Sequence, residues 1–157
     1  MPSYRAPVDD VLFLLRDVLG YERHDNVPGF ADATLDVVEA ILDEAARFCE
    51  EVLQPLNRTG DEEGCRLEDG RVTTPTGFRD AYRRLAEGGW IGLSADPAYG
   101  GQGLPHTLSA VVNEFMSAAN MAFAMYPGLT QGAIAALSRH GSEALKRRYL
   151  PKMISGE

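Results

Sequence analysis

Apolar residues recur along most of the chain at spacings of three and four, the period of a helix with one buried face. The clearest case is residues 35–56, where an apolar stripe lies opposite a side filled with Asp, Glu and Arg. Asp32 or Thr34 can cap this helix, and Pro55 is expected to bend or end it, because proline has no N–H to donate. The stripe comprises Leu35, Val38, Ile41, Leu42, Ala45, Cys49, Val52, Leu53 and Leu56.

Five other segments show the same period, each bounded by a capping residue, a proline or a glycine. They predict helices over residues 8–19, 75–87, 106–119, 121–139 and 143–154. Thr74 is the expected cap of the helix that follows it, with Pro75 at the first position, where no N–H is needed. Asn120 is the expected cap of the helix that begins at Met121, and Ser142 is the expected cap of the helix that begins at Glu143.

Residues 59–74 interrupt the helical pattern. Within them, Asp69-Gly70 is a two-residue hairpin signal, because both positions of the tightest hairpin turn need a positive φ. The flanking segments 66–68 and 71–73 hold few apolar residues, so only a small ribbon is expected. The predicted fold class is therefore all-α, a helical bundle of about six helices with a small β-ribbon near residues 66–73.

The size and charge of the chain narrow the classes of function. Its 157 residues suit one domain with a sizeable core. Fifteen Lys and Arg against twenty-three Asp and Glu give a net charge of −8, which argues against nucleic acid or an anionic membrane as a partner. No apolar run approaches the ~20 residues of a membrane span, and the first residues lack the order of a signal peptide, so a cytoplasmic location is expected.

Motifs for catalysis or cofactor binding are missing from the sequence. Gly100-Gly101-Gln102-Gly103 has neither the Gly-Lys-Ser/Thr ending of a phosphate loop nor the glycine spacing of a dinucleotide fingerprint. A tight structural turn is the favoured interpretation, and a turn that lets a ligand or another domain approach closely is the alternative. The three histidines and two cysteines show no metal-ligand spacing. We predict no catalytic residue, no metal site and no cofactor-binding residue in this chain.

The helix expected over residues 121–139 is apolar on nearly every face, which predicts a central helix buried on all sides. Its first part, from Asn120 to Gly132, is rich in Met, Ala and Gly and contains Tyr126. This mixture also suits the wall of an apolar ligand cavity. Because apolar residues continue on both sides of Pro127, the helix is expected to run through the proline with a bend.

A series of short motifs runs from Gly89 to Glu157, and each is weak alone but fairly specific in this order and spacing. The motifs are Gly89-Trp90-Ile91-Gly92-Leu93, Asp96-Pro97, Tyr99-Gly100-Gly101-Gln102-Gly103, Asn113-Glu114, Ser117-Ala118-Ala119-Asn120, Tyr126-Pro127-Gly128-Leu129, Gly132-Ala133-Ile134, His140-Gly141-Ser142-Glu143, Arg148-Tyr149-Leu150-Pro151-Lys152-Met153 and Ser155-Gly156-Glu157. Together they resemble the acyl-CoA dehydrogenases.

Two upstream segments resemble one branch of that family, which includes enzymes acting on methylthiopropanoyl-CoA. These segments are Pro2-Ser3-Tyr4-Arg5-Ala6-Pro7 with Phe13-Leu14-Leu15, and Pro55-Leu56-Asn57-Arg58 to Gly60-Asp61-Glu62-Glu63-Gly64-Cys65. The resemblance implies an N-terminal extension over residues 1–31, a short helix and connector, followed by an N-terminal helical domain over residues 32–157. It also implies that the flavin-binding β-domain and the C-terminal helical domain of the family are absent from this sequence.

The activity that the resemblance implies is the α,β-dehydrogenation of an acyl-CoA thioester. In this family a glutamate base takes the α-proton, the β-hydrogen leaves as hydride to FAD, and electrons then pass to an electron-transfer flavoprotein. The first flavin-contacting strand and the base both follow the Ser-Gly-Glu motif, so the chain alone is expected to hold no FAD and to be inactive. The complete protein is expected to be a homo-oligomer, because the family usually assembles through its C-terminal domain.

The resemblance implies that this chain can contribute part of the acyl pocket, from the helix that matches residues 120–132. The candidate substrate-binding residues are Met125, Tyr126, Leu129 and Phe123. Phe123 ranks last among the four because helical spacing can turn it away from the pocket.

Two other classes of function compete with a flavoenzyme fragment. The chain can be a non-catalytic helical interaction module, or a relative of the DNA-alkylation-response branch of the same family. The net charge of −8 argues against the DNA-binding alternative.

Overall fold

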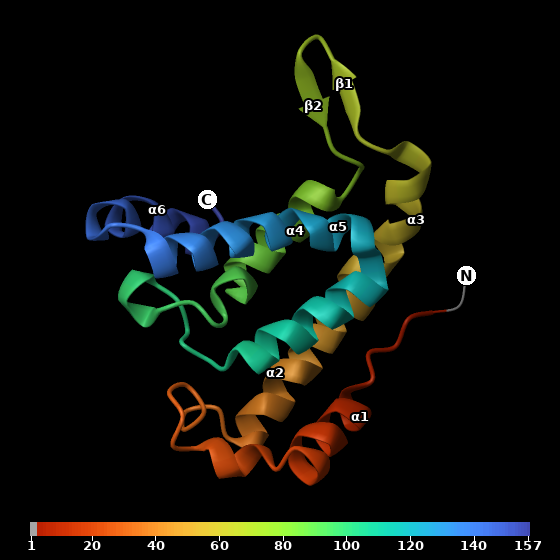
Figure 1. The fold of residues 1–157 in the computed structure, drawn as a ribbon. Helices are drawn as coiled ribbons and strands as arrows, with labels where there is room; N and C mark the ends of the chain where they lie inside the picture. The colour runs from red at the N-terminus through yellow and green to blue at the C-terminus, as the bar shows by residue number, and fades with distance from the viewer. Residues whose placement is uncertain (1–2) are drawn as a thin grey trace.

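Helices make up nearly all of the regular structure, as the apolar pattern predicts. The computed structural model describes residues 3–157. The α-helices and strands are α1 (Val8–Phe13), α2 (Leu35–Phe48), α3 (Gln54–Glu63), β1 (Arg66–Glu68), β2 (Arg71–Thr73), α4 (Phe78–Glu87), α5 (His106–His140) and α6 (Glu143–Ser155) (Figure 1). Short 3₁₀ or π segments are η1 (Leu14–Val18), η2 (Tyr21–His24), η3 (Cys49–Leu53), η4 (Trp90–Gly92) and η5 (Pro97–Tyr99). The predicted all-α class with one small ribbon is confirmed.

α2, η3 and α3 form one continuous helical rod that passes through Pro55. In the π turn η3, the Gln54 N–H bonds to the Cys49 carbonyl, five residues back. Pro55 follows directly after this π turn, near the start of α3, and the helix continues past it. Pro55 therefore does not end the helix, and helical structure continues to Glu63, beyond the interruption expected from Thr59.

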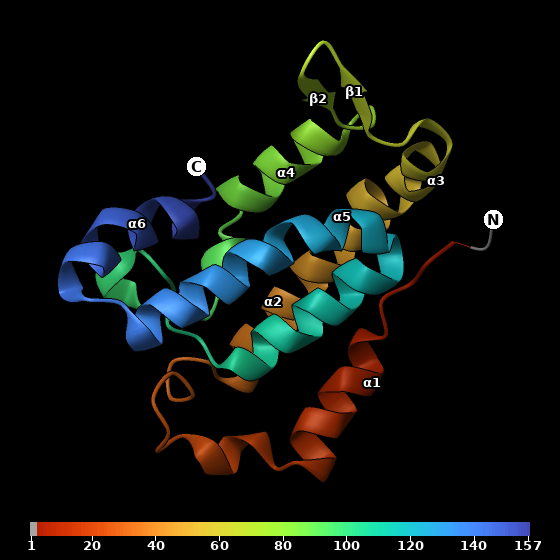
Figure 2. The ribbon, with the colours of Figure 1, turned by 45° about the horizontal axis from the view of Figure 1, so that its top comes forward.

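α5 consists of two helices that fold back on each other at Asn120 (Figures 1 and 2). Asn120 has extended dihedrals, φ −159° and ψ 88°, and its side-chain oxygen accepts the Phe123 N–H at 3.0 Å. The prediction of separate helices with Asn120 as the cap of the second is confirmed. The second half stays helical across Pro127, as predicted, and the break in the backbone lies at Asn120 instead.

The start of α4 differs from its prediction. Thr74 and Pro75 do not begin the helix, which starts at Phe78 after Gly77 turns the chain with a φ of +86°. The Thr76 N–H donates to the Glu63 carboxylate at 2.7 Å, and this bond lowers the pKa of Glu63. The Glu63 carboxylate, at the end of α3, thus binds the Thr76 N–H. In a helix that started at Pro75, this N–H would lie in the first turn.

The β-ribbon matches its prediction. β1 and β2 pair antiparallel, with Leu67 opposite Val72, and the two strands project from the helical body (Figure 1). Asp69 and Gly70 have φ values of 49° and 75°, the positive pair that a type I′ turn needs. All six strand residues are exposed, so the ribbon adds no side chain to the core.

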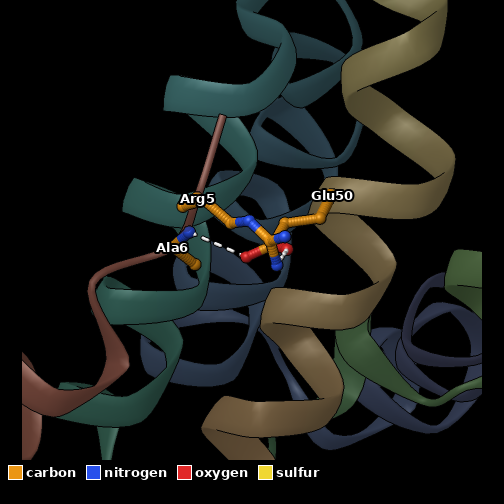
Figure 3. A network of polar contacts seen from close by, with 3 residues as sticks. All are labelled: Arg5, Ala6 and Glu50. Atoms are coloured by element: carbon orange, nitrogen blue, oxygen red, sulfur yellow. Dashed lines mark hydrogen bonds and ion pairs between the residues drawn. The ribbon is translucent and has the colours of Figure 1, made fainter. Parts of the chain in front are cut away.

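The N-terminal segment lies along the α2 rod and is held there by Glu50. One oxygen of its carboxylate accepts the Ala6 N–H at 3.0 Å, and the other accepts from the Arg5 guanidinium at 3.0 Å (Figure 3). Leu15 and Tyr21, from η1 and η2, are buried in the core beside α2 and α5. Residues 3–30 therefore belong to the same folded unit as the helices that follow.

Candidate functional site

The second half of α5 is not buried on all sides, so that prediction is wrong. Phe123, Pro127 and Ile134 point into the core. On the opposite side, Met121, Met125 and Leu129 are 59%, 63% and 80% exposed. The error has a physical origin, because a pattern that is apolar all round does not distinguish burial within a domain from an apolar surface.

This exposed side, termed the outer face, comprises Met121, Met125, Gly128, Leu129 and Gly132. Their spacing of three, four and seven residues places them on one side of the helix. A side-chain carbon added at Gly128 or Gly132 would meet no atom within 4 Å. The two glycines leave shallow open space between the longer side chains. Sequence reasoning chose Met125 and Leu129 but did not single out Gly128 and Gly132, although the same spacing pointed to them.

Phe123 takes a different position from the other candidates. Its side chain is fully buried, with its ring 5.8 Å from Phe78 and 6.2 Å from Tyr126, both in edge-on arrangements. Such edge-to-face pairs contribute about 0.5–1.5 kcal/mol beyond the area that they bury. Phe123 therefore supports Tyr126 from the core and does not itself reach the outer face.

Tyr126 lies at the border between the core and the surface, 38% exposed. Its hydroxyl is 3.4 Å from the Cys65 sulfur, just before the ribbon. The hydrogen bond with Cys65 and partial burial raise the pKa of Tyr126 to about 12, so the phenol is neutral at physiological pH. Tyr126 also borders a hollow of about 410 Å³ lined by Thr74, Phe78, Arg79 and Tyr82.

The glycine turn at residues 100–103 is a structural turn, as favoured from the sequence. The N–H groups of Gly101, Gln102 and Gly103 donate to the carbonyls of Asp96, Gly92 and Ala95. Gly100 and Leu104 likewise donate to backbone carbonyls. A phosphate-binding loop needs free N–H groups, and here all five are engaged.

A second hollow, of about 320 Å³, lies where the loop at residues 94–96 meets both halves of α5. The Ser94 hydroxyl and the His106 imidazole face each other across 3.5 Å in this hollow. The nearby Asp96 carboxylate caps the Ala98 N–H at 2.8 Å, and no hydrogen bond joins it to His106 among the described residues. This arrangement lacks the third member that an activated nucleophile requires.

Metal and membrane sites are not found in the described part of the chain. Within residues 3–157, no cluster of three or more His, Cys, Asp or Glu is placed to hold a metal ion. Over the same residues, no helix is long and apolar enough to cross a membrane.

Comparison with known proteins finds similarity to one family. Residues 36–157 match the family described as "Acyl-CoA dehydrogenase, N-terminal domain". A 3-methylmercaptopropionyl-CoA dehydrogenase of Ruegeria pomeroyi is 41% identical over 154 residues, which cover 98% of this chain and 26% of that protein. A butyryl-CoA dehydrogenase of Syntrophomonas wolfei is 31% identical over 159 residues, covering 99% of this chain and 26% of its own length. A mitochondrial isovaleryl-CoA dehydrogenase of Pongo abelii is 40% identical over 85 residues, covering 51% and 19%. The chain thus spans about a quarter of the length of the first two relatives.

Proposed function

The chain belongs to the acyl-CoA dehydrogenase family, and from this premise we propose that it is the N-terminal helical part of a flavin-dependent enzyme that dehydrogenates an acyl-CoA thioester. The resemblance to the branch that acts on methylthiopropanoyl-CoA is confirmed. A methylthiopropanoyl or other short acyl thioester is accordingly the proposed substrate class.

The main structural support for this proposal is the exposure of the apolar outer face of α5. A soluble domain that leaves Met121, Met125 and Leu129 largely exposed on one helix presents an apolar surface suited to contact with a ligand or another domain. Met and Gly suit an acyl chain, since thioether side chains adapt their shape and glycines leave room. We propose that Met125, Tyr126 and Leu129 form one wall of the acyl pocket, with Phe123 as support from behind.

Acyl-CoA dehydrogenases generally use FAD, but the glycine-rich turn of this chain does not fit a site for its phosphates. The glycine-rich turn has its N–H groups bonded to its own backbone and offers none to a pyrophosphate. No proton transfer is assigned to this chain, because the hollow beside Tyr126 is lined by no carboxylate and Asp96, the carboxylate that borders the other hollow, caps the Ala98 N–H. We propose that the flavin and the catalytic base are held by other parts of a longer protein.

The arrangement of the whole protein is part of the same proposal. Residues 1–31 form an N-terminal extension and residues 32–157 the helical domain, joined in a longer chain to a flavin-binding β-domain and a C-terminal helical domain. Acyl-CoA is the substrate and an electron-transfer flavoprotein the electron acceptor. The complete protein is proposed to be a cytoplasmic homo-oligomer; the two free cysteines of this chain fit a reducing compartment.

The chain by itself is expected to carry no flavin and to oxidise no acyl-CoA. It would be purified from a flavin-rich host, scanned for visible absorbance and assayed for dye reduction with acyl-CoA substrates. A colourless protein without turnover is the expected result. A yellow protein with turnover would show that the chain holds a flavin site that its geometry does not reveal.

The decisive test of the acyl wall uses the complete enzyme. Tyr126→Ala and Leu129→Ala are expected to change the ratio of kcat/KM between long and short acyl-CoA by about tenfold, because one methylene in an apolar pocket is worth roughly that much. Flavin content should stay unchanged.

Leu67→Ala on the ribbon is the matched control. Leu67 is 72% exposed, close to the 80% of Leu129, but it lies on β1 of the ribbon and not on the outer face of α5. Its replacement should leave the chain-length ratio as it is. Loss of flavin with an unchanged ratio in Tyr126→Ala would place Tyr126 in the support of the fold instead of the pocket.

A further inference from the structure

A hydrogen bond from Asn120 joins α5 to the α2 rod, at positions where each of the two departs from regular α-helical geometry. The rod of α2 and α3 is interrupted by the π turn η3, which ends at Leu53. α5 is interrupted at Asn120. The Asn120 amide nitrogen donates to the Leu53 carbonyl at 3.1 Å, so one side chain spans the two irregular positions.

The other end of the same amide builds the second half of α5. The Asn120 side-chain oxygen accepts the Phe123 N–H at 3.0 Å and caps the helix. Asn120 is only 1% exposed, so both bonds are shielded from water. Asparagine suits this position because its side chain is short enough to cap a helix and carries a donor and an acceptor on separate atoms. Aspartate lacks the donor, and serine has a single oxygen for both tasks.

The Asn120 amide is linked to the outer face through the residues of the helix that it caps. The capped residue, Phe123, packs its ring against Tyr126. Met125 and Leu129 lie on the same helix, within the first turns after the cap. The direction in which this helix leaves Asn120 decides where their side chains stand relative to the rest of the domain. A helix end held by two buried hydrogen bonds has one direction, whereas an uncapped end frays and can pivot.

We propose that Asn120 is a positioning residue for substrate selection: it fixes the angle between the two halves of α5 and thereby the placement of the acyl-contacting side chains. The inference rests on the proposed function of the outer face. Asn120 touches neither substrate nor cofactor in this role and acts through Phe123 and the helix that follows.

The first measurement is the distance between the two halves of α5 in the chain itself. Spin labels at the exposed positions 110 and 136, in a Cys65→Ser background, report that distance by pulsed electron spin resonance. A change of about 20° at the kink, over an arm of about sixteen residues rising ~1.5 Å each, moves the far end by roughly 8 Å. Asn120→Ala is expected to shift or broaden the distance distribution on this scale. An unchanged distribution overturns the inference.

Two further variants separate positioning from general loss of structure. Asn120→Ser keeps a capping oxygen and should stay closer to the wild-type distance than Asn120→Ala, even if the alanine variant folds poorly. Asn113→Ala removes a hydrogen bond that joins the two halves directly, from Asn113 to Gln131 at 3.1 Å, away from the kink. If Asn113→Ala moves the distance as much as Asn120→Ala, the angle is set along the whole helix pair and the inference fails.

The second measurement is substrate preference in the complete enzyme. Asn120→Ala is expected to change the ratio of KM between long and short acyl-CoA by about tenfold, with partial rescue by Asn120→Ser. Flavin content and kcat with the preferred substrate should change little, since the chemistry is not touched. A uniform fall in kcat for all substrates would show a merely structural role. If the distance shifts but Leu129→Ala leaves substrate preference unaltered, the proposed function fails, and the selective role of Asn120 fails with it.

Discussion

Gly101→Ala is expected to destabilise the chain by about 3 kcal/mol or more, because the added carbon would overlap the Ala95 carbonyl group. The clash is with backbone and not with a flexible side chain, so one of the two segments must move. The Gly101 N–H bonds to Asp96 and the neighbouring Gly103 N–H to Ala95, and a shift weakens both bonds. Unfolding in urea, followed by far-UV circular dichroism, measures the loss.

Gly128→Ala is the matched control for this substitution. Gly128 lies within α5, and an added carbon there meets nothing within 4 Å. Alanine should therefore stabilise the helix by up to ~1 kcal/mol through its higher helix propensity. Equal melting midpoints for the two variants would show that the turn at residues 100–103 is loosely packed, contrary to the structure.

Phe123→Ala is expected to cost about 3–5 kcal/mol, the usual loss for a fully buried aromatic side chain. The ring packs edge-on against both Phe78 and Tyr126, and its removal leaves a cavity at the junction of α4 and α5. Because typical domains have only 5–15 kcal/mol of stability, this single change can unfold much of the population at 37 °C. Chemical denaturation at a lower temperature keeps the measurement possible.

Met125→Ala, two residues further along the same helix, should change the stability by no more than about 0.5 kcal/mol. Met125 is 63% exposed and leaves no cavity when truncated. The pair thus separates support of the fold from the proposed contact with substrate. A large loss of stability in Met125→Ala would mean that the outer face is packed in solution against something other than water.

Local rules predicted several elements from neighbouring residues alone. The turn at Asp69-Gly70, the cap at Asn120 and the cap at Ser142 each depend on a side chain or a φ value within a few residues of the element that it shapes. No distant contact needed to be known, and the structure confirms all three. The helix through Pro127 belongs to the same group, because its apolar residues continue on both sides.

The predictions that were wrong involve partners far along the chain. α4 starts at Phe78 and not at Pro75, since Glu63 from the preceding helix takes the Thr76 N–H. The end of α3 depends on the same contact, because α3 runs past Thr59 to Glu63, whose carboxylate accepts that N–H. Neither effect can be read from the pattern of apolar residues, which records the period of a helix and not where its hydrogen bonds go.

For the candidate site too, the sequence determined some features and the tertiary structure decided others. Sequence alone determined that residues 120–132 are rich in Met, Ala and Gly and that Met125, Tyr126 and Leu129 are the residues to test. It also determined the helical fold class and the family resemblance, because periodicity and ordered motifs are properties of the sequence itself. Only the tertiary structure decided which side of an evenly apolar helix faces water. That choice is made by α4 and the α2 rod, which cover Phe123 and leave Leu129 exposed, and no period within one helix encodes the position of its neighbours.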